Sequence, residues 1–437
     1  MQWEGEWWLP GTTRRDVGVF RVNESDEPSL ELRTNLWTGL RMAGRDDLGL
    51  GEDDELLVLV HGESHGRKVT LQGVRRTTPG NHVPSTWAVV RGWEGAHLAE
   101  PQRTPVVGIR VGVHALAHWV SRSLGDGEEP VTMAWPGGGT LVLPEKRGWG
   151  WAALIYDGAR TLEEAEHDAF TLASLEGLLA GQQVSSPRLE ARLADGSVVT
   201  ELVRESRPAA PPLFSVADFG DGLARLVQRC NELRDELPLV LDRLQAAQEP
   251  QMALARALLV TSCLEPLFDI LYGPTDEDEV AFERRKKRVL RWIFRREDKK
   301  WVKACLASPL KFQEKMTRLL APLQPMLGWS DAEAKVWANN LHGLRVELAH
   351  RAEPAYRTNT RWLESAQLGN LGLTMTLYHL WVALGVKPDV AGAAAAAYWG
   401  KWQTWVLPSA VEEPLGDRRR MRGRKKSKHG RRRKPKT

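Results

Sequence analysis

The stretch Arg207-Pro208-Ala209-Ala210-Pro211-Pro212 divides the chain into two parts with different residue patterns. Because its prolines fix the backbone and cannot donate to a helix or sheet, residues 206–213 are predicted to form a stiff linker. Before the linker, short runs rich in β-branched residues alternate with Gly, Pro, Asn and Asp, a pattern typical of strands. After it, apolar residues recur at helical spacing. The sequence therefore predicts an α+β, multidomain chain.

The expected architecture has three parts. Residues 1–205 should form a β-rich, sandwich-like domain, and residues 214–408 an all-α helical bundle. Residues 409–437 should form a disordered basic tail. The strands expected in the first part are Val17–Val22, Ser29–Arg33, Glu55–His61, Lys68–Val74, Thr86–Gly92, Gly108–Val113, Thr140–Leu143 and Arg188–Leu193. A helix is expected to interrupt them over Thr161–Gln182, where leucines and alanines take helical spacing.

Helices follow one another beyond the linker. One should begin near Ser215, and a second should run from Glu249 to Leu271. A third is expected over Val280–Leu306. Ser330-Asp331-Ala332-Glu333 has the form of a capping box and predicts the start of the helix that carries Arg345. The last long helix is expected over Thr360–Leu384.

The charge of the chain is unevenly distributed. The formal net charge is +4, yet Arg418–Lys436 alone holds 13 Lys and Arg and no acid, so the remainder sums to about −9. Such a segment cannot bury enough apolar surface to fold alone, and it should attract polyanions such as RNA by releasing their counterions. A solubilising tail without a specific partner is the alternative.

Cysteine usage and the N-terminal residues both favour the cytoplasm. Cys230, Cys263 and Cys305 are far apart and odd in number, which is typical of buried thiols in a reducing compartment. The first residues, 1–6, include acids where a signal peptide has lysines. The apolar run Leu368–Val386 contains Asn and His and ends at Gly and Pro, so a buried core helix is predicted there and not a membrane span.

Several short motifs lack the context that their chemistry needs. Gly62-Glu63-Ser64-His65-Gly66 resembles a nucleophile elbow, but strand-like residues follow it, so we interpret it as a hairpin turn. His114 and His118 lie one helical turn apart without a third ligand, so no metal site is predicted. The acids of 276–279 lack the pattern of a calcium loop and are expected in a solvated loop. No cofactor is predicted.

The segment 284–296 mixes cations with aromatic residues on an expected helix. Cations bind phosphates, and aromatic faces stack on unpaired bases, which makes the segment a candidate RNA-binding surface. The alternative is an amphipathic helix with Leu290, Ile293 and Phe294 buried and a charged outer face. The candidate RNA-binding residues, together with one further along the chain, are Arg284, Arg285, Lys286, Lys287, Arg288, Arg291 and Arg351.

The stretch Arg345-Val346-Glu347-Leu348-Ala349-His350 holds the candidate catalytic residues. His can move a proton near neutral pH, and Arg can brace a phosphate as negative charge builds up, so the pair could break a phosphodiester without a metal. Arg345 and His350 are about 140° apart on a helix, so a two-fold dimer would be needed to bring two such pairs together. The alternative is a helix C-terminus that simply favours cations near its carbonyls.

The chain resembles the HEPN ribonuclease superfamily, and more closely ApeA-type bacterial anti-phage proteins. The HEPN signature is an Arg followed, four to six residues later, by a His, as at Arg345 and His350. The resemblance spans about residues 5–386 and rests on motif order. The motifs are Gly5-Glu6-Trp7-Trp8-Leu9-Pro10-Gly11, Gly18-Val19-Phe20, Gly62 to Leu71, Gly108-Ile109-Arg110-Val111-Gly112-Val113 to Trp119, and the helices around Ala257–Glu265, Arg345–His350 and Trp362–Gly385.

This resemblance implies a metal-independent endoribonuclease that acts as a homodimer through its helical domain in abortive anti-phage defence, with tRNA as the target. It implies that His350 transfers a proton and that Arg345 stabilises the crowded phosphorane, giving 2′,3′-cyclic phosphate and 5′-OH ends. The N-terminal domain would respond to a phage-derived trigger. The position after the Arg is usually polar and is Val346 here. The alternative is therefore a catalytically inactive RNA-binding and dimerisation protein that acts as a sensor.

Overall fold

A computed structural model describes residues 1–22, 28–34, 56–77, 84–124, 129–144, 150–182, 187–202, 212–219, 222–248, 253–293, 295, 310–350 and 359–403. The chain forms two compact units. The first comprises 1–180 and 184–216, and the second comprises 181–183 and 217–437. Most of the linker and the whole basic tail expected from the sequence, and Cys305, lie outside the described residues.

The first unit begins with a closed six-stranded antiparallel barrel. Its strands are β1 (Gln2–Trp8), β2 (Asp16–Arg21), β3 (Ser29–Leu32), β4 (Leu56–Ser64), β5 (Arg67–Arg76) and β6 (Ser85–Glu94). They pair in the order β3-β2-β1-β4-β5-β6, and β3 also pairs with β6 to close the ring. The β-rich region is confirmed, but its core is a barrel where the sequence suggested a sandwich-like domain.

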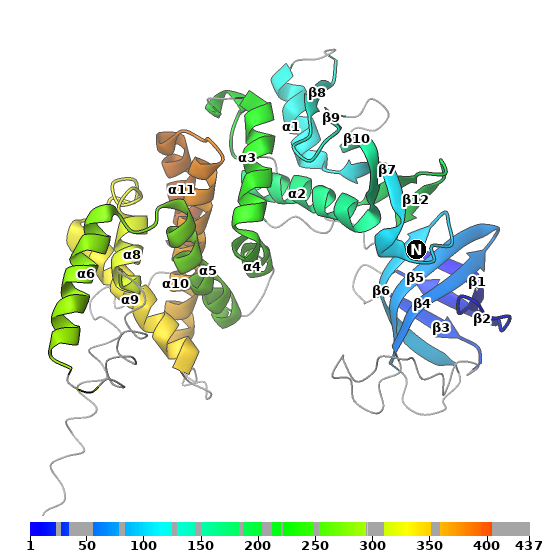
Figure 1. Ribbon diagram of the computed structural model, residues 1–437, viewed down its shortest axis with the longest axis horizontal. Coiled ribbons are helices and arrows are strands. Elements are labelled where there is room, and N and C mark those ends of the chain that lie inside the picture. Colours follow the sequence, from blue (N-terminus) through cyan, green and yellow to red (C-terminus); the bar gives the residue numbers. More distant parts are fainter. Residues whose placement is uncertain are drawn as a thin grey trace, which may run out of the picture. The chain divides into compact units, whose positions relative to one another are not determined.

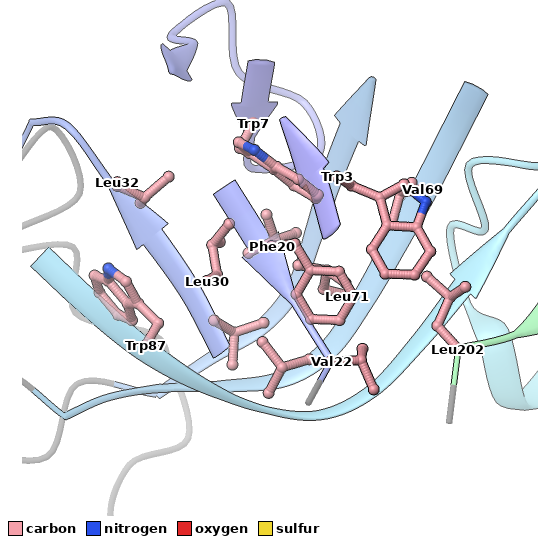
Figure 2. Close-up of a cluster of buried hydrophobic side chains, with 13 residues drawn as sticks. Trp3, Trp7, Phe20, Val22, Leu30, Leu32, Val69, Leu71, Trp87 and Leu202 are labelled. Atoms are coloured by element: carbon pink, nitrogen blue, oxygen red, sulfur yellow. The ribbon is translucent and has the colours of Figure 1, made fainter. Parts of the chain in front are cut away.

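Tryptophan and leucine side chains fill the barrel. Along β1, Trp3 and Trp7 are buried while the residues between them are more exposed, as the two-residue period of a strand requires. Figure 2 shows Trp7, Phe20 and Leu71 pointing into the same interior from different strands. Gly62 allows a close approach of the Trp7 ring, because a Cβ built there would lie 2.3 Å from that ring.

The hairpin between β4 and β5 confirms the interpretation of the Gly62–Gly66 motif. Its turn residues His65 and Gly66 have φ angles of 50° and 76°, so both adopt the left-handed backbone of a tight two-residue turn. Because a strand follows this turn where a hydrolase elbow needs a helix, the Ser64 hydroxyl is not a nucleophile on an elbow. It donates a hydrogen bond to the Glu4 carbonyl at 2.7 Å.

The sheet continues beyond the barrel through β6. The further strands are β7 (Pro105–Gly112), β8 (Val131–Ala134), β9 (Thr140–Leu143), β10 (Trp151–Thr161), β11 (Leu189–Leu193) and β12 (Val198–Glu201). They extend the order as β6-β12-β11-β7-β10-β9-β8. Helix α1 (His114–Leu124) contacts β10, and helix α2 (Leu162–Ala180) contacts β7, β10 and β11 (Figure 1). The helix expected over Thr161–Gln182 is thus confirmed.

An arginine of the barrel also forms ion pairs with the rest of the first unit. Arg91 of β6 contacts Glu166 of α2 at 2.5 Å and Glu201 of β12 at 2.7 Å. Burial raises the pKa of Glu201 to about 7 although the charge of Arg91 acts in the opposite direction. Arg91 therefore opposes the effect of burial, which raises the pKa of both carboxylates.

The second unit is helical (Figure 1). Its main helices are α3 (Gly222–Glu236), α4 (Pro238–Gln248), α5 (Ala253–Leu271), α6 (Asp276–Arg291), α8 (Phe312–Leu320), α9 (Asp331–His350), α10 (Asn359–Ala383) and α11 (Pro388–Gln403). Helices α5 and α10 pack closely, because Gly372 of α10 lies against Val260 of α5 with no room for a Cβ. The apolar run that begins at Leu368 is a buried core helix, as predicted. Among the described residues, no helix has the length and apolar character that crossing a membrane requires.

Helix α6 differs from the expectation. It begins at Asp276, so the acids of 276–279 form its first turn, and the prediction of a loop there was wrong. A capping box explains this start, since the Thr275 side chain accepts from the Asp278 amide while Asp278 accepts from the Thr275 amide. The helix ends at Arg291, and the remainder of the expected 280–306 helix is mostly outside the described residues.

Candidate functional site around Arg345

Helix α9 carries both candidate catalytic residues. Its start is fixed by the capping box that the sequence predicted: the Ser330 hydroxyl accepts from the Glu333 amide, and the Glu333 carboxylate accepts from the Ser330 amide at 2.8 Å. The helix runs to His350 without a break. Arg345 lies in its last two turns, and His350 is its final residue. The side chain of His350 and all of Arg351 are outside the described residues.

The guanidinium of Arg345 is half-exposed and has two neighbours. Its Nη2 lies 2.6 Å from Oε2 of Glu265 on α5, and 40% of the Arg345 side chain is accessible. Its Cζ lies 4.5 Å from the centroid of the Phe312 ring, at the start of α8. Stacking on an aromatic face and pairing with a carboxylate both hold a guanidinium in one orientation. Arg345 is therefore set in place by α5 and α8 while its outer edge faces solvent.

A second cation shares the same carboxylate. Lys315 of α8 lies 3.3 Å from Oε1 of Glu265 and 2.7 Å from Asp269, and only 3% of its side chain is exposed. The two oxygens of Glu265 are thus divided between Lys315 and Arg345. We call Asp269, Lys315, Glu265 and Arg345 the ion cluster. Its two cations and two carboxylates balance, which lets a lysine be buried at this position.

His342 lies on the same side of α9 as Arg345. The two residues are three apart, about 60° around the helix, whereas His350 is about 140° away. The His342 ring centroid lies 5.9 Å from that of Phe312. Partial burial and the charge of Arg345 lower the pKa of His342, so its imidazole is neutral at pH 7 and able to accept a proton.

The cations of helix α6 form a separate surface. All residues of α6 are exposed or half-exposed, which includes Arg284, Arg285, Lys286, Lys287, Arg288 and Arg291. Lys286 pairs with Glu283 at 2.8 Å and lies 5.2 Å from the Phe282 ring centroid. The alternative of a buried apolar face is not what α6 shows, because Leu290 and Ile293 are only half-buried. Phe294 is outside the described residues.

Sequence reasoning named Arg345 as a candidate but did not name the residues that surround it. Glu265, Lys315 and Phe312 come from two other helices, and no local pattern connects them to α9. His342 could have been found, because a spacing of three places it beside Arg345 on any helix.

The structure also shows where the residues lie for which the sequence argued against a site. His114 and His118 are both exposed on α1. Within the ranges that the structure describes, no three His, Cys, Asp or Glu side chains stand close enough to share a metal ion. Cys230 and Cys263 are buried thiols outside any disulfide, and burial raises the pKa of each to about 12, so neither is a nucleophile at neutral pH.

No family model, no curated protein and no solved structure matches the chain.

Proposed function

We propose that the helical unit is a HEPN-type, metal-independent endoribonuclease with Arg345 as the residue that binds the scissile phosphate. The observation that supports this most directly is the setting of Arg345. Its guanidinium is oriented by Phe312, open to solvent, and paired with a carboxylate that a phosphate can replace. Arg binds carboxylate and phosphate through the same planar fork of donors, so a phosphate can take the place of Glu265 without moving the Arg345 stem.

The chemistry follows from one proton acceptor and one fixed cation. A neutral imidazole takes the proton of the ribose 2′-OH as that oxygen attacks the adjacent phosphorus. Arg345 stabilises the negative charge that collects on the non-bridging oxygens. The imidazolium returns this proton to the 5′-oxygen as the bond between that oxygen and phosphorus breaks, which gives a 2′,3′-cyclic phosphate and a 5′-OH end. Val346 supplies no hydrogen bond, so Arg345 and one histidine carry the reaction.

Two histidines on α9 are candidates for the proton acceptor. His350 is the residue that the HEPN resemblance indicates. His342 is favoured by a different observation, since it shares the face of Arg345 and its pKa is lowered. The two can be separated by testing each substitution alone.

A second function remains a candidate because of α6 and Val346. An exposed helix with six cations binds RNA without needing a catalytic residue. In this reading, the helical unit is an RNA-binding and dimerisation module that acts as a sensor. In either reading we infer a bacterial cytoplasmic protein in anti-phage defence that acts on tRNA, forms a homodimer through the helical unit and responds to a phage-derived trigger through the first unit.

The deciding experiment is cleavage of total tRNA by the purified full chain in EDTA, with product ends mapped. Wild type is compared with Arg345→Ala, His350→Ala and His342→Ala. His118→Ala is the matched control, because His118 is an exposed histidine of the first unit. The nuclease proposal expects cyclic-phosphate ends from wild type and from the control, and none from Arg345→Ala. Cleavage that persists in Arg345→Ala would refute it, and RNA binding without cleavage by any variant would favour the sensor.

A further inference from the structure

Helices α6, α8 and α9 line an open cavity of about 610 Å³ that shares no lining residue with the ion cluster. One face of α6 contributes Phe282 and Arg285 to its lining. The start of α8 contributes Lys311, and the second turn of α9 contributes Lys335. None of these α8 and α9 residues was marked by the sequence.

The cavity carries an excess of positive charge. Its lining includes four cations and two carboxylates, Asp278 and Glu314, which leaves two positive charges. Both carboxylates already accept hydrogen bonds from other groups of the protein. Asp278 accepts from Arg318 at 2.6 and 2.7 Å, and Glu314 accepts from the Lys311 backbone amide at 2.8 Å.

Three cations of the lining have no carboxylate of their own. Among the described residues, the side chains of Arg285, Lys311 and Lys335 make no ion pair. They come from three different helices and face one space. All three are exposed, so a phosphate that enters the cavity can contact them without first breaking an ion pair.

The fourth cation of the lining, Arg318, joins two of the helices that form the cavity. Arg318 holds Asp278 through two parallel hydrogen bonds and keeps the pKa of that carboxyl well below its usual range. This pairing ties α6 to α8 although α6 has no buried residue. The half-buried ring of Phe282 adds an aromatic surface beside the cations.

We propose that this cavity binds a phosphate group of a nucleotide, with Arg285, Lys311 and Lys335 contacting the phosphate oxygens and the Phe282 ring beside the base or sugar. Cations that converge on a concave site and an aromatic face are the two features that nucleotide sites combine. The phosphate belongs either to an RNA strand or to a free nucleotide.

The position of the cavity favours an RNA strand over a free nucleotide. This argument rests on the proposed function. Lys311 directly precedes Phe312, whose ring packs on Arg345. Lys335 and Arg345 lie ten residues apart on one helix, which corresponds to about 15 Å. A strand whose scissile phosphate lies at Arg345 therefore reaches the cavity within a few nucleotides.

The test measures binding of a fluorescein-labelled, 2′-O-methyl oligonucleotide to the full chain. This strand has no 2′-OH nucleophile and cannot be cut, so binding is read whether or not the protein is a nuclease. The cavity variant is Arg285→Gln, Lys311→Gln and Lys335→Gln combined. The matched variant removes the same charge from three exposed cations that lie outside the cavity and outside α6, through Arg192→Gln, Lys387→Gln and Lys401→Gln. Both variants keep the basic C-terminal segment, and circular dichroism checks that both fold.

The cavity variant is expected to bind at least about tenfold more weakly, and the slope of log affinity against log salt between about 50 and 200 mM should fall by about 2, since each phosphate contact on a single strand contributes about 0.7. The matched variant should keep most of the affinity. Equal losses in the two variants would overturn the proposal, because they would show a diffuse attraction with no site.

A second arm separates the two sources of phosphate. ATP binding is measured on wild type and on the cavity variant. If the cavity variant loses ATP binding but keeps oligonucleotide binding, the site is assigned to a free nucleotide. Absence of both effects would refute the cavity as a phosphate site. Cleavage assays remain independent, because a nuclease with a defective cavity still cuts at saturating RNA with a raised KM.

Discussion

Acid should destabilise the helical unit through one buried histidine. His379 of α10 is 1% exposed, and it joins α10 to the ends of two other helices. Its Nε2 lies 2.8 Å from the Leu319 carbonyl oxygen, and its Nδ1 lies 2.6 Å from the Tyr272 hydroxyl. Because the carbonyl can only accept, Nε2 carries the proton and Nδ1 accepts from Tyr272.

The size of the effect follows from the pKa. Burial lowers the pKa of His379 from 6.5 to about 4. Between pH 6.5 and pH 4, the histidine is protonated in the unfolded chain but still neutral in the folded chain. The free energy of unfolding therefore falls as the pH drops from 6.5 towards 4. Each unit of difference is worth 1.36 kcal/mol, so the full window amounts to about 3.4 kcal/mol.

The assay is urea unfolding of the full chain, followed by circular dichroism at the helix band and repeated between about pH 7.5 and 4. Wild type is compared with His379→Gln, which is neutral throughout. The variant should be less stable at pH 7 by about 1–3 kcal/mol, because Tyr272 and the Leu319 carbonyl lose partners. Between pH 6.5 and 4, wild type should lose about 3 kcal/mol more than the variant does.

Tyr272→Phe is the matched control, since it removes one hydrogen bond to His379 and leaves the imidazole in place. Its stability should fall with acid as that of wild type does. Parallel losses in wild type and His379→Gln would refute the reasoning, because the acid sensitivity would then come from other groups.

Three further perturbations test other parts of the molecule. Glu265→Gln removes the carboxylate that holds Arg345, and since a half-exposed ion pair is worth about 1 kcal/mol, affinity for the uncleavable strand should rise about fivefold. A weaker affinity would show instead that the carboxylate is needed to orient the arginine. Gly62→Ala should cost the barrel about 1–3 kcal/mol, because the new Cβ meets a tryptophan ring, whereas Gly158→Ala, which has open space, should be tolerated in the same unfolding measurement. Deleting Asp417–Thr437 removes 13 cations and should lower RNA affinity and flatten its salt dependence; an unchanged slope would show that the segment does not touch RNA.

Local patterns predicted many elements of this chain, but they missed strands β1, β8, β10 and β12 and helices α8 and α11. The hairpin at Gly62–Gly66, the helix α2 and the core helix α10 all follow from signals within a single segment. Barrel closure does not, because Ser29–Leu32 pairs with Ser85–Ala88 across more than fifty intervening residues. A two-residue period predicts which face of a strand is buried, but it does not predict which strand pairs with it.

The same limit applies to the candidate site. Arg345 was found because arginine and histidine near a helix end form a recognisable spacing. Glu265 and Lys315 were not found, because a carboxylate on α5 and a lysine on α8 look like ordinary surface charges until packing buries one of them. The start of α6 was missed for a related reason: the acids after Thr275 resemble a loop unless their interaction with the helix N-terminus is considered.

Strand β6 makes the first unit mechanically continuous. It closes the barrel by pairing with β3 and β5, and its last residues pair with β12. Between these contacts, Arg91 reaches both Glu166 on α2 and Glu201 on β12. A ligand or partner that strains the barrel wall would therefore also pull on α2 through Arg91, and a barrel cut out of the chain would lose both carboxylate partners of Arg91 together with the strand that pairs with the end of β6.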